Sequence, residues 1–147
     1  MTDKLLEALS NGMTTTNAEA TRELGRKLAA VLPVDSVLAL RGELGTGKTT
    51  LVSGIAAGLG IEQPVTSPTY NYFNLYRAKG RQLVHLDAYR LETEAQADSL
   101  MLEDMLISPW LLVVEWPERF APSWFKKAPT LQITVAGEQA RHFQLEA

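Results

Sequence analysis

The sequence has no cysteine, no long apolar run and no large excess of charge of either sign. The missing thiol excludes disulfides, thiolate metal sites and cysteine nucleophiles, and it is compatible with a reducing cytosol. A net charge of −3 argues against a broad basic face that grips nucleic acid through its phosphates. The first residues, MTDKLLEALSNG, have no signal-peptide core, and no apolar run is long enough to cross a membrane. We therefore expect a cytoplasmic protein without membrane contact.

The length of 147 residues suits one domain with its own hydrophobic core. Hydrophobic residues make up 46% of the chain and charged residues 21%, which is the balance of an ordinary globular protein. No repeat, linker or low-complexity tract divides it. We expect a single domain over residues 1–147. Residues 1–15 are either flexible or a short first strand, and residues 4–9 are equally compatible with a loose helix.

A phosphate-binding loop is the strongest signal in the chain. Residues 42–50 read GELGTGKTT, and Gly42, Gly47, Lys48 and Thr49 fit the pattern G-x-x-x-x-G-K-S/T. Glycines let the backbone turn tightly and bring several N–H groups onto a polyphosphate. Lys48 would place a positive charge on the outer phosphates, and the Thr49 hydroxyl would ligate magnesium. The predicted nucleotide contacts are Gly42, Glu43, Leu44, Gly45, Thr46, Gly47, Lys48, Thr49 and Thr50.

The segments on either side of the loop fit the same interpretation. Residues 36–40 are an apolar run typical of a buried strand. Apolar residues after Lys48 recur at helical spacing, and Gly58 and Gly60 then end that helix. Strand, loop and helix in this order are what a phosphate loop requires, and a glycine-rich turn without a ligand is the alternative. An earlier helix is predicted to start at a capping box formed by Thr16 and Glu19 and to stop before Pro33.

Two acidic residues each follow an apolar strand. Asp87 closes residues 82–86 and Glu115 closes residues 110–114. Open α/β sheets present catalytic groups at the carboxyl ends of their strands. Asp87 could hold magnesium there, or it could be a turn aspartate. Glu115 could orient or deprotonate a water molecule or hold the metal, or it could be a surface glutamate.

The segment VTSPTY, residues 65–70, is dense in hydroxyl groups. It is either a switch-like loop, in which Ser67 and Thr69 present hydroxyls to the metal or the last phosphate, or a turn leading into a strand. Residues 70–77 and 81–87 predict an antiparallel hairpin, and residues 131–136 and 141–145 predict a second one. Between them we expect a helix over residues 92–106. His85 and His142 are interpreted as structural histidines.

Four segments taken together, GELGTGKTT, SPTYNYFNLY, HLDAYRL and VVEWPER, resemble the TsaE (YjeE) family of small bacterial P-loop ATPases. The similarity runs from about Thr16 to Arg119, and the stretch before Thr16 departs from the family by lacking a clear apolar first strand. The resemblance implies a three-layer α/β domain of the P-loop NTPase kind, whose mixed sheet carries added antiparallel hairpins. The family holds the nucleotide base near the start of its first helix, so the resemblance implies the same place for the base in this chain.

The same resemblance implies roles for named residues and partners. Lys48, Asp87 and Glu115 would be the catalytic residues, with Thr49, Asp87 and Glu115 near the magnesium and Ser67 and Thr69 in a segment that behaves like switch I. ATP and Mg²⁺ would be the cofactors. The protein would bind a TsaB–TsaD pair and support the threonylcarbamoyladenosine modification of tRNA, touching tRNA only indirectly.

Three functions remain open from the residues themselves. The leading hypothesis is an ATPase that hydrolyses slowly alone, because no arginine is clearly placed as a finger; Arg90 and Arg119 are candidates that more simply form surface ion pairs. The second is a small-molecule kinase using the same loop. The third is a module that binds nucleotide without hydrolysing it. The absence of an N-K-x-D segment for reading guanine favours adenine.

Overall fold

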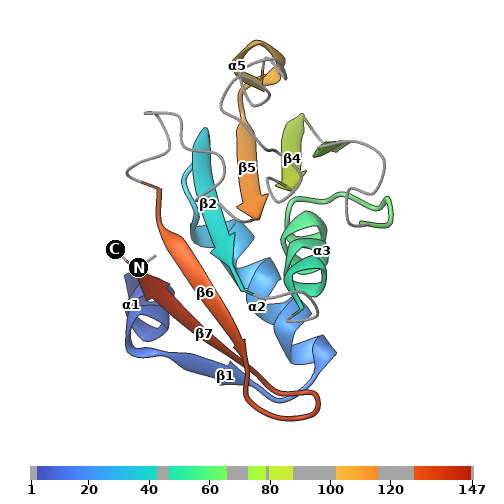
Figure 1. Cartoon of the computed structure of the whole chain (residues 1–147). Coiled ribbons are helices and arrows are strands. Elements are labelled where there is room, and N and C mark those ends of the chain that lie inside the picture. The colour runs from blue at the N-terminus through green and yellow to red at the C-terminus, as the bar shows by residue number, and fades with distance from the viewer. Residues whose placement is uncertain are drawn as a thin grey trace.

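The computed structural model describes residues 3–42, 47–65, 73–78, 80–87, 102–115 and 128–146. They form a mixed sheet with helices packed against it (Figure 1). The elements are α1 (Asp3–Asn11), β1 (Met13–Thr15), α2 (Ala18–Val31), β2 (Ser36–Arg41), α3 (Lys48–Gly58), β3 (Phe73–Ala78), β4 (Arg81–Asp87), α5 (Leu102–Met105), β5 (Trp110–Glu115), β6 (Thr130–Val135) and β7 (Arg141–Glu146).

The seven described strands lie in the order β1-β7-β6-β2-β5-β4-β3. The centre is parallel, because β2 pairs in parallel with both β5 and β6, and β5 pairs in parallel with β4. Antiparallel partners extend both sides: β3 pairs with β4, and β7 with β6 and β1. The two predicted hairpins are therefore confirmed. So is the predicted α/β class with a mixed sheet and added antiparallel strands.

Alternation along the central strands separates two apolar clusters. Leu38, Leu40 and Val113 point to the face where residues of α1, α2 and α3 complete the larger cluster. Val84 and Leu112 belong to the smaller cluster on the opposite face, where Leu106 and Ala128 also pack. The range 92–106, where a helix is expected, lies mostly outside the described residues, and the short helix α5 lies within its described end.

Helices α2 and α3 lie side by side on the sheet (Figure 1) and touch through glycines. A Cβ atom at Gly25 would lie 2.4 Å from the carbonyl oxygen of Leu51, and one at Gly54 would lie 2.1 Å from that of Arg22. Only glycine fits at these two positions, because the neighbouring atoms are backbone. This close contact fixes the helix that follows the phosphate loop against the helix that precedes β2.

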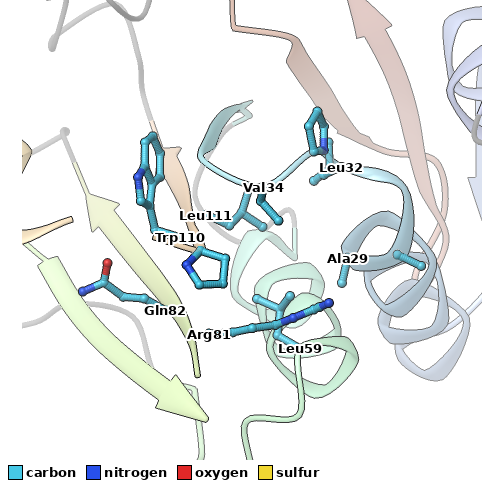
Figure 2. A pocket seen from close by; sticks show the side chains of 11 residues that line it. Ala29, Leu32, Val34, Leu59, Arg81, Gln82, Trp110 and Leu111 are labelled. Atoms are coloured by element: carbon cyan, nitrogen blue, oxygen red, sulfur yellow. The ribbon is translucent and has the colours of Figure 1, made fainter. Parts of the chain in front are cut away.

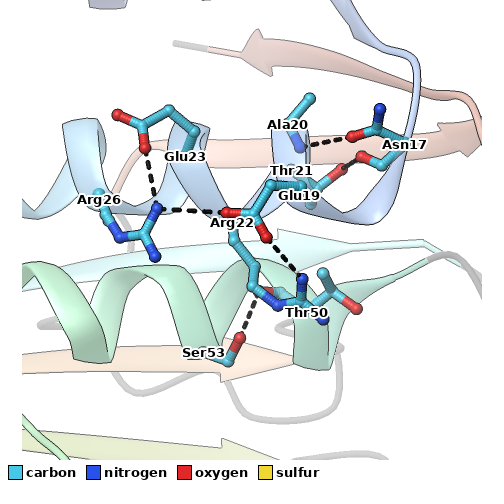
Figure 3. Close-up of polar contacts among 9 residues, drawn as sticks. All are labelled: Asn17, Glu19, Ala20, Thr21, Arg22, Glu23, Arg26, Thr50 and Ser53. Carbon is cyan, nitrogen blue, oxygen red and sulfur yellow. Dashed lines mark hydrogen bonds and ion pairs between the residues drawn. The ribbon is translucent and has the colours of Figure 1, made fainter.

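The start of α2 differs from the predicted capping box. Asn17, not Thr16, is the N-cap, and its side chain accepts a hydrogen bond of 2.8 Å from the backbone N–H of Ala20 (Figure 3). Asparagine is among the strongest N-cap residues, so it takes the position one residue after the predicted threonine. Glu19 instead forms ion pairs with Arg22 and Arg26 on the exposed surface of α2 (Figure 3). The hydrogen bond that Arg26 donates to the Glu23 carboxylate raises the pKa of Arg26.

Residues 3–15 form a helix followed by a short strand. Helix α1 covers Asp3–Asn11, and Leu9 is fully buried in the larger cluster. β1 then adds three residues to the edge of the sheet beside β7. The sequence left both a helix over residues 4–9 and a short strand open for this stretch, and the structure contains both, since α1 covers residues 4–9 and β1 follows it. None of the described helices is long and apolar enough to span a membrane.

Candidate functional site

The site is centred on the first turn of α3, which begins at Lys48 as the pattern requires. Gly47 precedes it with φ 95° and ψ 21°, a left-handed conformation that glycine adopts without strain. Its carbonyl accepts the first helical hydrogen bond, 3.0 Å from the N–H of Leu51. The early N–H groups of a helix have no carbonyl partner in the helix, so this end of α3 is suited to bind an anion.

Lys48 is buried although it is charged, with 5% of its surface exposed. Its ammonium Nζ donates a hydrogen bond to the carbonyl oxygen of Gly42, the first residue of the loop. Gly42 directly follows β2, so this bond ties the two ends of the loop together. A lysine is rarely buried without an anionic or carbonyl partner. The side chain is therefore held where the loop would enclose a phosphate.

Two carboxylates end the parallel strands beside this loop. β4 ends at Asp87 and β5 ends at Glu115, and these two residues are opposite each other in the parallel register. Glu115 is in turn opposite Leu40 of β2, two residues before the loop begins. Leu40 points to the same face as α3, and register partners share a face, so both carboxylates lie on the α3 side. Asp87 and Glu115 therefore end neighbouring strands at the same end of the sheet.

His85 forms a buried pair with Glu115. The imidazole is 0% exposed and the glutamate 5% exposed, and His85 Nε2 contacts Glu115 Oε2. Glu115 is thus a buried residue rather than a surface glutamate. The interpretation of His85 as structural did not include this contact. The two-residue period of a strand places His85 on the same side as Asp87, and this was the signal that could have revealed it.

A hollow of about 130 Å³ lies beside the loop, and we call it the α2–α3 hollow. Three separate parts of the chain line it: the start of α2, the start of α3 and the β6–β7 turn. Sequence reasoning missed this meeting because the lining residues are far apart in the chain. The lining residues are Ala18, Thr21, Gly47, Thr50, Glu138, Gln139 and Arg141.

Arg141 is the positively charged residue among the described residues that line the α2–α3 hollow. Its guanidinium donates hydrogen bonds to the carbonyl oxygens of Ala140 at 2.8 Å and Gly137 at 3.3 Å. A Cβ atom built on Gly47 would lie 3.8 Å from Arg141 Nε, so the arginine also lies against the phosphate loop. The β6–β7 turn is thereby fixed beside the nucleotide-binding pattern.

A second hollow, of about 210 Å³, lies at the other end of the sheet, where β4 and β5 begin (Figure 2). Leu59, Trp110 and Leu111 give it apolar walls, and Arg81 lies at its side (Figure 2). No carboxylate is among its described lining residues. It is remote from the loop and lacks the groups that phosphate chemistry needs.

The groups that could hold a magnesium ion are all oxygen donors: the Thr49 hydroxyl and the carboxylates of Asp87 and Glu115. Magnesium prefers such ligands and is commonly bound by one or two carboxylates together with substrate phosphates. Within the described ranges, no group of three or more His, Asp or Glu side chains forms a complete metal site by itself. The residues present therefore fit a metal that arrives with a nucleotide.

Several predicted residues lie outside the described residues: Glu43, Leu44, Gly45 and Thr46 of the loop, Ser67 and Thr69 of the switch-like segment, and Arg90 and Arg119. Their roles stay predictions. His142 is described, and its Nδ1 lies 3.1 Å from Thr14 Oγ1, a contact that joins β7 to β1. This agrees with the structural role predicted for it.

Comparison with known proteins gives consistent relatives. A family model described as "Threonylcarbamoyl adenosine biosynthesis protein TsaE" matches residues 15–143. A Nostoc protein called "tRNA threonylcarbamoyladenosine biosynthesis protein TsaE" is 42% identical over 73% of this chain and 69% of its own length. A Bacillus subtilis protein with the same description is 33% identical over 90% of this chain and 83% of its own.

The fold agrees with a solved relative. The crystal structure of Bacillus subtilis YdiB superposes with a TM-score of 0.66 at 28% identity, covering 90% of this chain and 81% of that one. On the family match over residues 15–143 and the two relatives above, the chain belongs to the TsaE family.

Proposed function

We propose that this protein binds ATP with magnesium and hydrolyses it slowly, in support of the threonylcarbamoyladenosine modification of tRNA. One observation carries the ATPase part: a buried lysine at the amino end of α3 lies at the same end of the sheet as the paired residues Asp87 and Glu115. The names of the family and of its relatives support the pathway.

The loop and α3 would bind the phosphates. Lys48 would leave the Gly42 carbonyl and bond to the outer phosphates, while the N–H groups at the start of α3 bond to their oxygens. The α2–α3 hollow lies beside Gly47, and Ala18 and Thr21 from the start of α2 line it. The adenine would bind in this hollow, because the family holds the base near the start of its first helix. Arg141 would lie on one side of it.

The carboxylates would divide the remaining work. Thr49 and Asp87 would hold magnesium, which when bound neutralises charge on the phosphates. Glu115 would accept a hydrogen bond from the attacking water and aim it at the outer phosphorus. Slow hydrolysis in the isolated protein is expected because these groups position the water but supply no additional cation to the developing charge.

The proposed partners are a TsaB–TsaD pair, as the family resemblance implies. ATP hydrolysis would reset the complex between rounds rather than make the modification itself. The net charge of −3 supports only indirect contact with tRNA, because a direct grip on its backbone needs clustered lysines and arginines.

The test is phosphate release from ATP by wild type and Glu115→Ala, each with purified TsaB and TsaD. Glu62→Ala is the matched control, since Glu62 is an exposed glutamate beyond α3. We expect release by wild type and by the control, and loss of release in Glu115→Ala. Equal background release in all three would show a module that binds without hydrolysing. Phosphate appearing on a small acceptor would show a kinase, which the β3–β4 hairpin disfavours by occupying the length that a lid and acceptor site would use.

A further inference from the structure

The His85–Glu115 pair carries a further inference, which rests on the proposed ATPase function. We propose that His85 is a positioning residue for hydrolysis: it holds the Glu115 carboxylate in the orientation that receives the attacking water. The described hydrogen-bonding contact of the imidazole is with Glu115.

The geometry of the sheet explains how the histidine reaches the glutamate. In the parallel register of β4 and β5, His85 is opposite Val113, and Asp87 is opposite Glu115. The contact between the two side chains therefore spans two positions of the register, and His85 lies two residues before the end of β4. The contact uses Oε2 of the carboxylate. The other oxygen, Oε1, is then the one left to accept a hydrogen bond from water.

Stability alone does not account for a histidine at this position. The side chain is 0% exposed, and its Nδ1 has no hydrogen-bond partner in the described part of the chain. Burying an unpartnered ring nitrogen costs stability, and an apolar side chain of similar size would avoid that cost. Residues that break such a rule are expected at functional sites, where the gain lies elsewhere. Here the gain is a fixed carboxylate.

The two acidic residues differ in burial. Glu115 is buried and in contact with His85, whereas Asp87 is half-buried at the end of β4. A misplacement of about 1 Å can cost a factor of about 100 in rate when a group must align a reactant. Glu115, held by His85, is therefore suited to aim the water. Asp87, the more accessible of the two, is suited to meet a metal that enters with the nucleotide.

The experiment compares three substitutions at one position. His85→Gln keeps an amide N–H where Nε2 lies and can still donate to Glu115. His85→Leu fills the space without a donor, and His85→Asn has the same amide but is too short to reach. With TsaB and TsaD present, we measure kcat for phosphate release and, separately, the Kd for ATP. Gln82→Leu is the control, because Gln82 is a buried polar residue of β4 whose side chain bonds to the backbone at Met105 and Ile107.

We expect His85→Leu and His85→Asn to lower kcat about 10- to 100-fold, as loss of a supporting hydrogen bond does at comparable sites. The Kd for ATP should stay within about twofold of wild type, and His85→Gln should recover most of kcat. Gln82→Leu should lower the melting temperature and leave kcat unchanged. If His85→Leu does not fold, the Gln and Asn variants carry the comparison.

Two results would overturn the inference. One is a wild-type kcat in His85→Leu or His85→Asn; the other is an equal loss in the Gln, Asn and Leu variants, which would mean that the ring acts by packing. Failure of the proposed function looks different, because wild type itself would then release no more phosphate than Glu115→Ala.

Discussion

Replacing Gly54 with alanine tests the close contact between α2 and α3 that places the phosphate loop. The added Cβ would lie 2.1 Å from the carbonyl oxygen of Arg22 and 2.8 Å from its carbonyl carbon. A carbon and a carbonyl oxygen normally come no closer than about 3.3 Å. The two helices must therefore separate by about 1 Å, since the obstructing atoms are backbone and cannot rotate away.

Two opposing effects set the magnitude. Alanine is favoured over glycine in a helix interior by about 1 kcal/mol. Overpacking typically costs about 1–3 kcal/mol and occasionally more, and a backbone clash of this depth belongs at the upper end. The net change in the free energy of unfolding is then a loss of about 2 kcal/mol. For a chain of this size that is a fall in melting temperature of about 4–8 °C.

Thermal and denaturant unfolding of Gly54→Ala measures this, with Gly137→Ala as the matched control. A Cβ at Gly137 meets nothing nearer than Ala140 Cβ at 3.4 Å, an ordinary contact at an exposed turn. The control should lie within about 0.5 kcal/mol of wild type. Because α3 also carries Lys48 and Thr49, Gly54→Ala should weaken ATP binding as well. A Gly54→Ala protein as stable as wild type, or more stable by the helix preference of alanine, would refute the contact.

Three further predictions concern single side chains. Lys48→Ala should weaken ATP binding at least tenfold, because a charged contact to the outer phosphates is lost. The control Lys27→Ala, which changes an exposed lysine on α2, should not weaken binding. An unchanged Kd for Lys48→Ala in an ATP titration would contradict the assignment. Asp87→Ala should reduce ATP affinity more with magnesium than without it, so equal losses in the two buffers would indicate a structural aspartate. Asn17→Ala should lower the free energy of unfolding by about 1 kcal/mol and Thr16→Ala by much less, and the reverse order in a denaturant titration would restore the predicted capping box.

Much of the fold is written in local patterns. The phosphate loop is a contiguous pattern, and the apolar runs around it predicted β2, α3, β4 and β5 closely. Gly60 lies at the end of α3 as predicted, with φ 86°. The N–H of Ile61 then donates a hydrogen bond to the carbonyl oxygen of Ala56. Such features depend on neighbours in the chain, so the sequence is sufficient to find them.

What could not be predicted depends on parts of the chain that meet only after folding. The α2–α3 hollow is lined by Thr21, Thr50 and Arg141, and no local sequence pattern links these three residues. The bond between His85 and Glu115 depends on the register of two parallel strands joined by a long connection. At the start of the chain, the choice between helix and strand stayed open for another reason. α1 is amphipathic and polar overall, and its one fully buried residue, Leu9, gives too weak a period to separate helix from strand.

The most direct test of the central claim is phosphate release by the purified protein, first alone and then with TsaB and TsaD, with ATP and GTP compared in parallel. We predict slow release from ATP alone, a clear change in rate when the pair is added, and little use of GTP. Release that never exceeds that of Glu115→Ala, with or without the pair, would contradict the account of this protein as an ATPase.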